Sequence, residues 1–107
     1  MTGDDLRRLA LALPEAEEKS HFGKADFRVR DKIFASLPDD ARAVVKLTPE
    51  EQAFTMAAEP DLIAPATGAW GRKGWTVVHL ADADETLIAD LLRRAWNNVA
   101  PKRLRGG

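Results

Sequence analysis

The sequence predicts a two-layer α+β fold in which helices cover one face of an antiparallel sheet. Segments with the apolar period of about 3.6 residues that is typical of helices alternate with groups of short segments that have the features of strands. The predicted order is α-β-β-β-α-β-β-α, within a single domain that spans residues 1–107.

The first helix is predicted before Pro14, since Leu6, Leu9, Ala10 and Leu13 recur on one helical face. Thr2, followed three residues later by Asp5, resembles a capping box. Pro14 ends the helix because proline removes a backbone donor.

Three strands follow the first helix. Apolar and basic residues alternate over 27–30, as expected for a strand with one buried face. A reversal at Asp31 and Lys32 leads to a second strand over 33–37, and residues 43–47 form the third. We therefore expect an antiparallel meander.

A second helix begins after Thr48, since a capping hydroxyl is followed by Pro49 at the first helical position and by Glu51 to complete a capping box. Its apolar stripe is narrow and consists largely of alanine. The residues expected to be buried on this helix are Phe54, Ala57 and Ala58.

Two more strands and a helix complete the order. Residues 62–64 predict a short edge strand and residues 75–80 a longer one, with a glycine-rich loop over 68–74 between them. Asp82 and Glu85 mark the start of the last helix, whose apolar stripe is Ile88, Leu91, Leu92, Ala95 and Val99. Residues 101–107 are expected to form a short, basic, mobile tail.

Composition excludes several kinds of chemistry. The absence of cysteine excludes disulfides, thiolate metal sites and cysteine nucleophiles. No apolar segment is long enough to cross a membrane, so a cytoplasmic protein is expected. A monomer is favoured. Glu18 and His21 have a metal-ligand spacing, and Ser20 adjoins His21, but both pairs lie in a predicted connector. We therefore predict no metal, no cofactor and no enzymatic activity.

Cations cluster in three places along a chain whose formal net charge is only −1. If Phe27 and Val29 point inward, the cations of the first hairpin form an outward stripe, which is either a solvated face or a binding surface. The candidate nucleic-acid-binding residues are Arg28, Arg30 and Lys32 in this hairpin, Arg72 and Lys73 in the glycine-rich loop, and Lys102 and Arg103 in the tail.

The glycine-rich loop has two interpretations. Flexible glycines, two cations and Trp70 could approach a phosphate backbone and stack on a base. The alternative is a mobile turn with Trp70 folded onto the core. Trp75 and Trp96 are expected in the core because of their positions in a strand and a helix.

Four stretches, in this order and spacing, resemble the MmcQ/YjbR family of small bacterial proteins: Leu13-Pro14, residues 27–35, Gly74-Trp75 and residues 100–104. The resemblance implies a fold similar to that of secretion-chaperone-like two-layer proteins, and a DNA-binding role. Family members often have Gly-His-Pro-Ala-Phe before the first strand, where this chain has Phe22-Gly-Lys-Ala-Asp-Phe27.

Two hypotheses for the function follow. In the first, the chain binds DNA through the basic hairpin, with the glycine-rich loop as a wing, which requires the separated cations to converge on one surface. In the second, the chain is a protein-interaction or chaperone-like module without catalytic activity, which requires an exposed apolar patch or an uncovered sheet edge.

Overall fold

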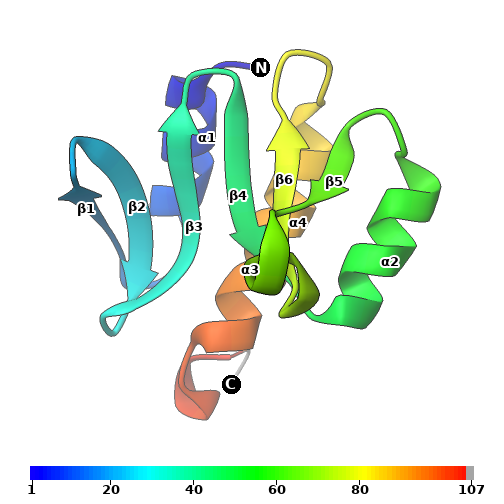
Figure 1. Ribbon diagram of the computed structural model, residues 1–107. Helices are drawn as coiled ribbons and strands as arrows, with labels where there is room; N and C mark the ends of the chain where they lie inside the picture. Colours follow the sequence, from blue (N-terminus) through cyan, green and yellow to red (C-terminus); the bar gives the residue numbers. More distant parts are fainter. Residues whose placement is uncertain (106–107) are drawn as a thin grey trace.

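Six antiparallel strands form one open sheet in the computed structural model, which describes residues 1–105 apart from the side chain of His21. Their order across the sheet is β1-β2-β3-β4-β6-β5 (Figure 1). The strands are β1 (Ala16–His21), β2 (Lys24–Val29), β3 (Lys32–Asp39), β4 (Arg42–Lys46), β5 (Ile63–Pro65) and β6 (Trp75–His79). The helical elements are α1 (Gly3–Leu11), α2 (Pro49–Ala58), α3 (Gly68–Arg72), α4 (Glu85–Val99) and the 3-10 turn η1 (Lys102–Leu104). The predicted α+β class is confirmed.

Two elements, β1 and α3, are absent from the sequence prediction because neither has an apolar period. Strand β1 pairs with β2 from Ala16 to His21, where a connector was expected. It is an edge strand, and Glu18 and Ser20, on the side of the helices, remain exposed. Helix α3 occupies the predicted glycine-rich loop and is only five residues long.

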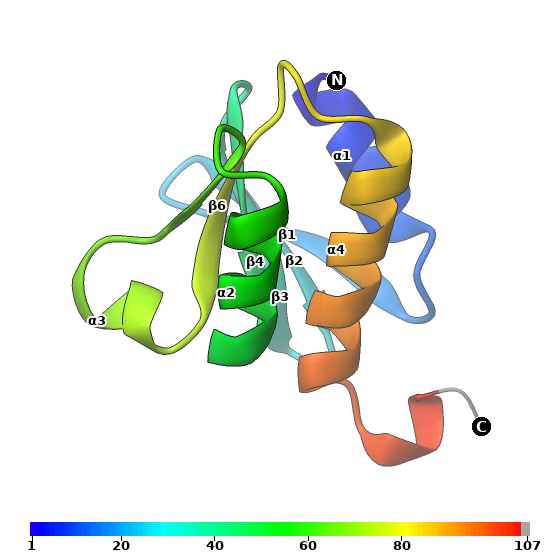
Figure 2. The ribbon, with the colours of Figure 1, turned by 90° about the vertical axis from the view of Figure 1, so that its right-hand side faces the viewer.

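The core lies between the sheet and two helices, α1 and α4, which cover one face (Figure 2). The predicted stripe of α4 is confirmed at Ile88, Leu91, Leu92 and Ala95, which pack with Phe27 and Phe34 of the sheet. Trp96 is 2% exposed, as predicted for a core residue, and its Nε1 donates to the carbonyl of Pro14 at 2.9 Å. This bond fixes α4 to the end of the α1 segment.

Helix starts are set by capping side chains. Thr2 and Asp5 form the predicted capping box of α1. The last helix is capped by Asp84, whose Oδ1 accepts from the amide of Leu87 at 2.7 Å, rather than by Asp82 as predicted. The segment predicted as a mobile tail forms η1, and its Leu104 packs against the core; residues 106–107 lie outside the described part of the chain.

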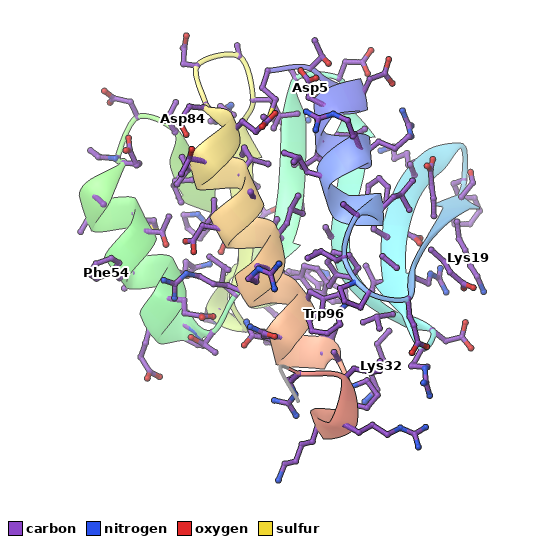
Figure 3. The ribbon with its side chains drawn as sticks, turned by 180° about the vertical axis from the view of Figure 1, so that it is seen from behind. Asp5, Lys19, Lys32, Phe54, Asp84 and Trp96 are labelled. Atoms are coloured by element: carbon purple, nitrogen blue, oxygen red, sulfur yellow. The ribbon has the colours of Figure 1, made fainter. Side chains whose placement is uncertain are left out.

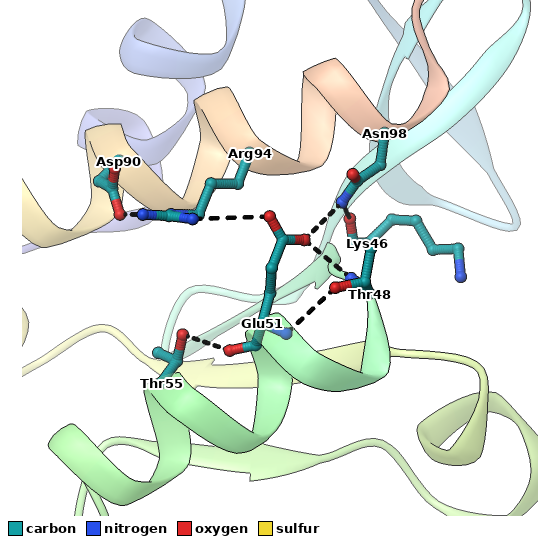
Figure 4. A network of polar contacts seen from close by, with 7 residues as sticks. All are labelled: Lys46, Thr48, Glu51, Thr55, Asp90, Arg94 and Asn98. Atoms are coloured by element: carbon teal, nitrogen blue, oxygen red, sulfur yellow. Dashed lines mark hydrogen bonds and ion pairs between the residues drawn. The ribbon is translucent and has the colours of Figure 1, made fainter.

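Helix α2 begins with the predicted capping box, which a network extends to α4 (Figure 4). The Glu51 amide donates to the Thr48 hydroxyl at 3.1 Å, and the Thr48 amide donates to Glu51 Oε1 at 2.9 Å. Asn98 Nδ2 donates to the same Oε1 at 2.9 Å and to the Lys46 carbonyl at 3.0 Å. Glu51 Oε2 lies 3.6 Å from Arg94. One carboxylate therefore links two helices.

The predicted buried face of α2 is wrong. Phe54 is 76% exposed, and Ala57 and Ala58 are exposed too. The inward side of the helix instead carries Thr55, which is buried, half-buried Gln52, and Met56, which packs against the core. This orientation arises because the chain beneath α2 offers backbone carbonyls and a hydroxyl, which polar side chains can bind.

The charge of Glu51 should make stability depend on pH. Burial disfavours the charged carboxylate, but hydrogen bonds from Thr48 and Asn98 and the charge of Arg94 outweigh it, so the pKa of Glu51 lies below its ordinary value. Glu51→Gln is expected to lower the free energy of unfolding by about 1–2 kcal/mol at pH 7.

The loss in free energy of unfolding caused by Glu51→Gln should be complete above the ordinary pKa of 4.5. It should shrink as the pH falls through the lower pKa that Glu51 has in the folded state. Urea unfolding of wild type and variant at pH 7 and pH 3 measures it. Glu50→Gln, at an exposed neighbouring position, is the control. Equal losses at the two pH values would contradict the assignment.

A second prediction concerns Gly74, which has a φ of 105° and lies against the backbone of the β4–α2 connection. A Cβ at this position would be 1.8 Å from the carbonyl oxygen of Leu47. Gly74→Ala is therefore expected to lower the free energy of unfolding by about 3 kcal/mol or more. Gly23→Ala has a similar φ of 77° but no atom within 4 Å, so its loss should be about 1 kcal/mol. Thermal unfolding compares the two variants, and equal losses would show that close packing at Gly74 is unimportant.

Candidate functional site

The predicted basic stripe of the first hairpin does not form. Arg28 lies on the sheet face away from the core, and its Nε and Nη2 donate to the two carboxylate oxygens of Asp26 at 2.8 and 3.0 Å. Arg30 lies in the β2–β3 turn with a φ of 51°, and its Nε donates to Glu15 at 2.7 Å. These bonds raise the pKa of both guanidinium groups, and the bond from Arg30 lowers the pKa of Glu15. Both guanidinium groups are thus paired with carboxylates. Lys32 is the first residue of β3, beyond the turn, and does not extend a stripe of cations along β2.

The other predicted cations do not converge either. Within residues 1–105, none of Lys32, Arg72, Lys73, Lys102 and Arg103 has a carboxylate at ion-pair distance. Arg72 lies in α3 and Lys73 directly follows it, whereas Lys102 and Arg103 lie in η1. Helix α3 and η1 lie on opposite sides of the sheet (Figure 2). Lys32 lies at the same end of the molecule as η1 (Figure 3). The five cations therefore form two separate groups.

Within residues 1–105, α3 alone covers the face of the sheet opposite α1 and α4, and this face carries two tryptophans. Trp70 of α3 is 64% exposed, and Trp75 at the start of β6 is half-buried rather than in the core as predicted. Their ring centroids are 6.2 Å apart at an interplanar angle of 73°. Lys73 Nζ lies 5.9 Å from the centre of the Trp70 ring, and Lys46 Nζ lies 5.6 Å from that of Trp75. Each aromatic ring thus has a cation beside it.

An apolar trough of about 350 Å³ runs beside the two tryptophans along this open face. Cross-strand register aligns Asp26, Ser36 and Val44 on neighbouring strands, so their side chains share the open face. The trough is lined by Lys24, Ala25, Asp26, Ile33, Ser36, Pro38, Val44, Ala66, Thr67, Trp70 and Trp75. Because Arg28 neutralises Asp26, the unpaired charges around the trough are positive.

The tryptophans are held from behind by α2. Gln52 Nε2 lies within hydrogen-bond distance of the carbonyls of Gly71 (3.1 Å) and Trp75 (3.1 Å) and of Thr76 Oγ1 (3.0 Å). Gly71 of α3 serves close packing rather than flexibility, since a Cβ at this position would lie 2.0 Å from the Ala66 carbonyl oxygen. The tryptophans therefore lie on a short helix and a strand that hydrogen bonds and close packing join to α2 and to residue Ala66.

The structure gives the other candidate residues no shared chemistry. Among the described residues, no three His, Asp or Glu side chains are grouped so that they could hold a metal ion. Glu18 accepts from Arg7 Nε at 2.8 Å, while the side chain of His21, its predicted partner, lies outside the described part. No helix in the described chain has the length and apolar character needed to cross a bilayer.

Comparison with known proteins agrees with this architecture. The crystal structure of protein DR2400 from Deinococcus radiodurans, which carries the family-model domain DUF419, matches with a TM-score of 0.80 at 28% identity, over 95% of this chain and 80% of that one. No curated protein matches the chain. The model of the YjbR family matches residues 11–98, which include the whole sheet and most of α4. The chain therefore belongs to the YjbR family.

Proposed function

We propose that the chain is a non-catalytic nucleic-acid-binding module that holds a single strand on the open face of its sheet. The observation that carries this proposal is the pair of tryptophans, each with a lysine ammonium within 6 Å of its ring centre, beside an apolar trough. Nucleic acid combines flat apolar bases with a phosphate at every step, and this surface offers partners for both.

The exposed ring of Trp70 supplies a stacking platform for one base. The trough beside it has apolar walls and the hydroxyls of Ser36 and Thr67, which have no hydrogen-bond partner among the described residues. An unpaired base can enter such a trough, whereas a paired base keeps its faces stacked within the duplex. These features favour a single strand over a duplex.

Cations at the rim support contact with the phosphates. Lys46 and Lys73 lie beside the tryptophans, and Lys24 lines the opposite part of the trough. The Lys46 ammonium also donates to the carbonyl of Lys73, which fixes its position between β4 and α3. The chain as a whole has a net charge of −1, so binding depends on this local group rather than on overall attraction.

Removal of the stacking platform tests the proposal. Trp70→Ala is expected to weaken binding of a fluorescein-labelled oligothymidine by about tenfold, because one stacked base contributes about 1–3 kcal/mol. Fluorescence anisotropy at low salt measures the affinity. The free energy of unfolding should fall by no more than about 1 kcal/mol, since the side chain is largely exposed and loses mainly its edge contact with Trp75.

Phe54→Ala is the matched control, because Phe54 is also an exposed aromatic residue but belongs to α2. It should leave the affinity for oligothymidine unchanged. Absence of binding by the wild type, equal losses in the two variants, or equal affinity for a blunt duplex would contradict the proposal.

Salt dependence tests the role of the lysines separately. Lys73→Gln is expected to reduce the slope of log affinity against log salt concentration by about 1, as the loss of one phosphate contact requires. Lys102→Gln, on the opposite side of the sheet, should leave this slope unchanged. If the two variants change the slope equally, the strand does not lie on the open face.

A further inference from the structure

Helix α2 presents part of its apolar surface to solvent. Phe54 is 76% exposed, Ala58 one turn later is exposed, and neither contributes to the core. An aromatic side chain in this position buries no surface within the chain, so its apolar area is available to another molecule. Trp70, the other strongly exposed ring of the described helices, already belongs to the open-face site.

Phe54 borders a groove of about 500 Å³ between α2 and α4 (Figure 3). The apolar residues of this groove are Phe54 and Ala58 of α2 and Leu87 and Leu91 of α4. Two adjacent helices separated by an apolar groove are the usual receptor for a third, amphipathic helix. The groove shares no lining residue with the trough of the open face.

The rim of the groove is acidic. It contains the carboxylates of Glu50, Glu51, Glu59 and Asp90 against the single guanidinium of Arg94. That guanidinium is already bound, with Asp90 Oδ2 at 2.9 Å from Nε and Glu51 Oε2 at 3.6 Å from Nη1. Glu50 and Glu59 have no ion-pair partner within the described residues.

Glu59 adds a second unfavourable feature. It is the C-cap residue of α2, where the exposed carbonyls already carry partial negative charge, and the last turn has no basic residue to compensate. A carboxylate at this position costs stability within the isolated chain. A cationic partner would remove that cost.

We infer that the groove between α2 and α4 binds a basic amphipathic helix of another protein. The apolar face of that helix would cover Phe54 and Leu87, and its Lys or Arg side chains would lie beside Glu50 and Glu59. The uncompensated carboxylates select a cationic helix and disfavour an acidic one.

Two synthetic helical peptides of about 14 residues test this inference. They share the same leucine positions, at i, i+3, i+4 and i+7 spacing, and carry either lysine or glutamate elsewhere. Fluorescence anisotropy with the full chain should detect binding of the Leu/Lys peptide and at least tenfold weaker binding of the Leu/Glu peptide. Equal affinities would overturn the inference.

Variants locate the site. Phe54→Ala and Glu59→Lys are each expected to weaken binding of the Leu/Lys peptide roughly tenfold, and since both residues are exposed the variants should fold normally. Asp82→Lys makes the same charge change at an exposed position in the β6–α4 loop and should have less than about a twofold effect. Equal effects of Glu59→Lys and Asp82→Lys would show general attraction to an acidic surface and overturn the inference.

Self-association is the competing occupant. Sedimentation of wild type and of Phe54→Ala over a range of concentrations distinguishes it. A dimer that Phe54→Ala dissolves would assign the groove to a second copy of the chain and overturn the inference, whereas a monomer at all concentrations supports a different protein as the partner.

Discussion

Two helices, α1 and α4, cannot cover both faces of a six-stranded sheet, and the other features of this molecule depend on that mismatch. Helices α1 and α4 bury one face with Phe27, Phe34 and Trp96. The opposite face is covered, in the described part of the chain, by the short α3 alone, so Trp70 and the trough remain accessible. Helix α2 stands at the β5 edge, where it contacts β5 and is held by the hydrogen bonds of Gln52 as well as by Met56 against the core.

The polar contacts of α2 link the open face of the sheet to the groove between α2 and α4. Gln52 binds the carbonyl groups around α3 and thereby supports the tryptophans. Glu51 binds Asn98 and Thr48 and thereby sets the distance between α2 and α4. With its polar residues directed inward, the helix presents Phe54 outward. One helix orientation therefore supports the open face and creates the acidic groove.

Most local features follow from the sequence, apart from the N-cap of α4, whereas features that depend on distant neighbours do not. The capping boxes at Thr2 and Thr48 and the α4 stripe involve residues within one or two helical turns, so spacing predicts them. The buried side of α2 depends on the carbonyls beneath it, which no periodicity records. The pairing of Arg30 with Glu15 depends on strand β1, which has no apolar alternation. Candidate cations could thus be named, but their partners could not. Of the predicted cations, Lys73 borders the open face. Lys46 also borders it, but nothing in the sequence beyond its place in a strand marks it as a binding residue.

Both outer strands are poor templates for the backbone of another chain. Strand β1 is bounded by residues in left-handed conformation, Glu15 (φ 56°) and Phe22 (φ 53°), and exposes Glu17 and Lys19 along its length. At the far side, β5 has three residues and ends in Pro65, which lacks an amide donor. Growth of the sheet into fibrils is therefore opposed at either end, and the apolar area on the open face can be retained without the aggregation that an unprotected sheet of this kind would promote.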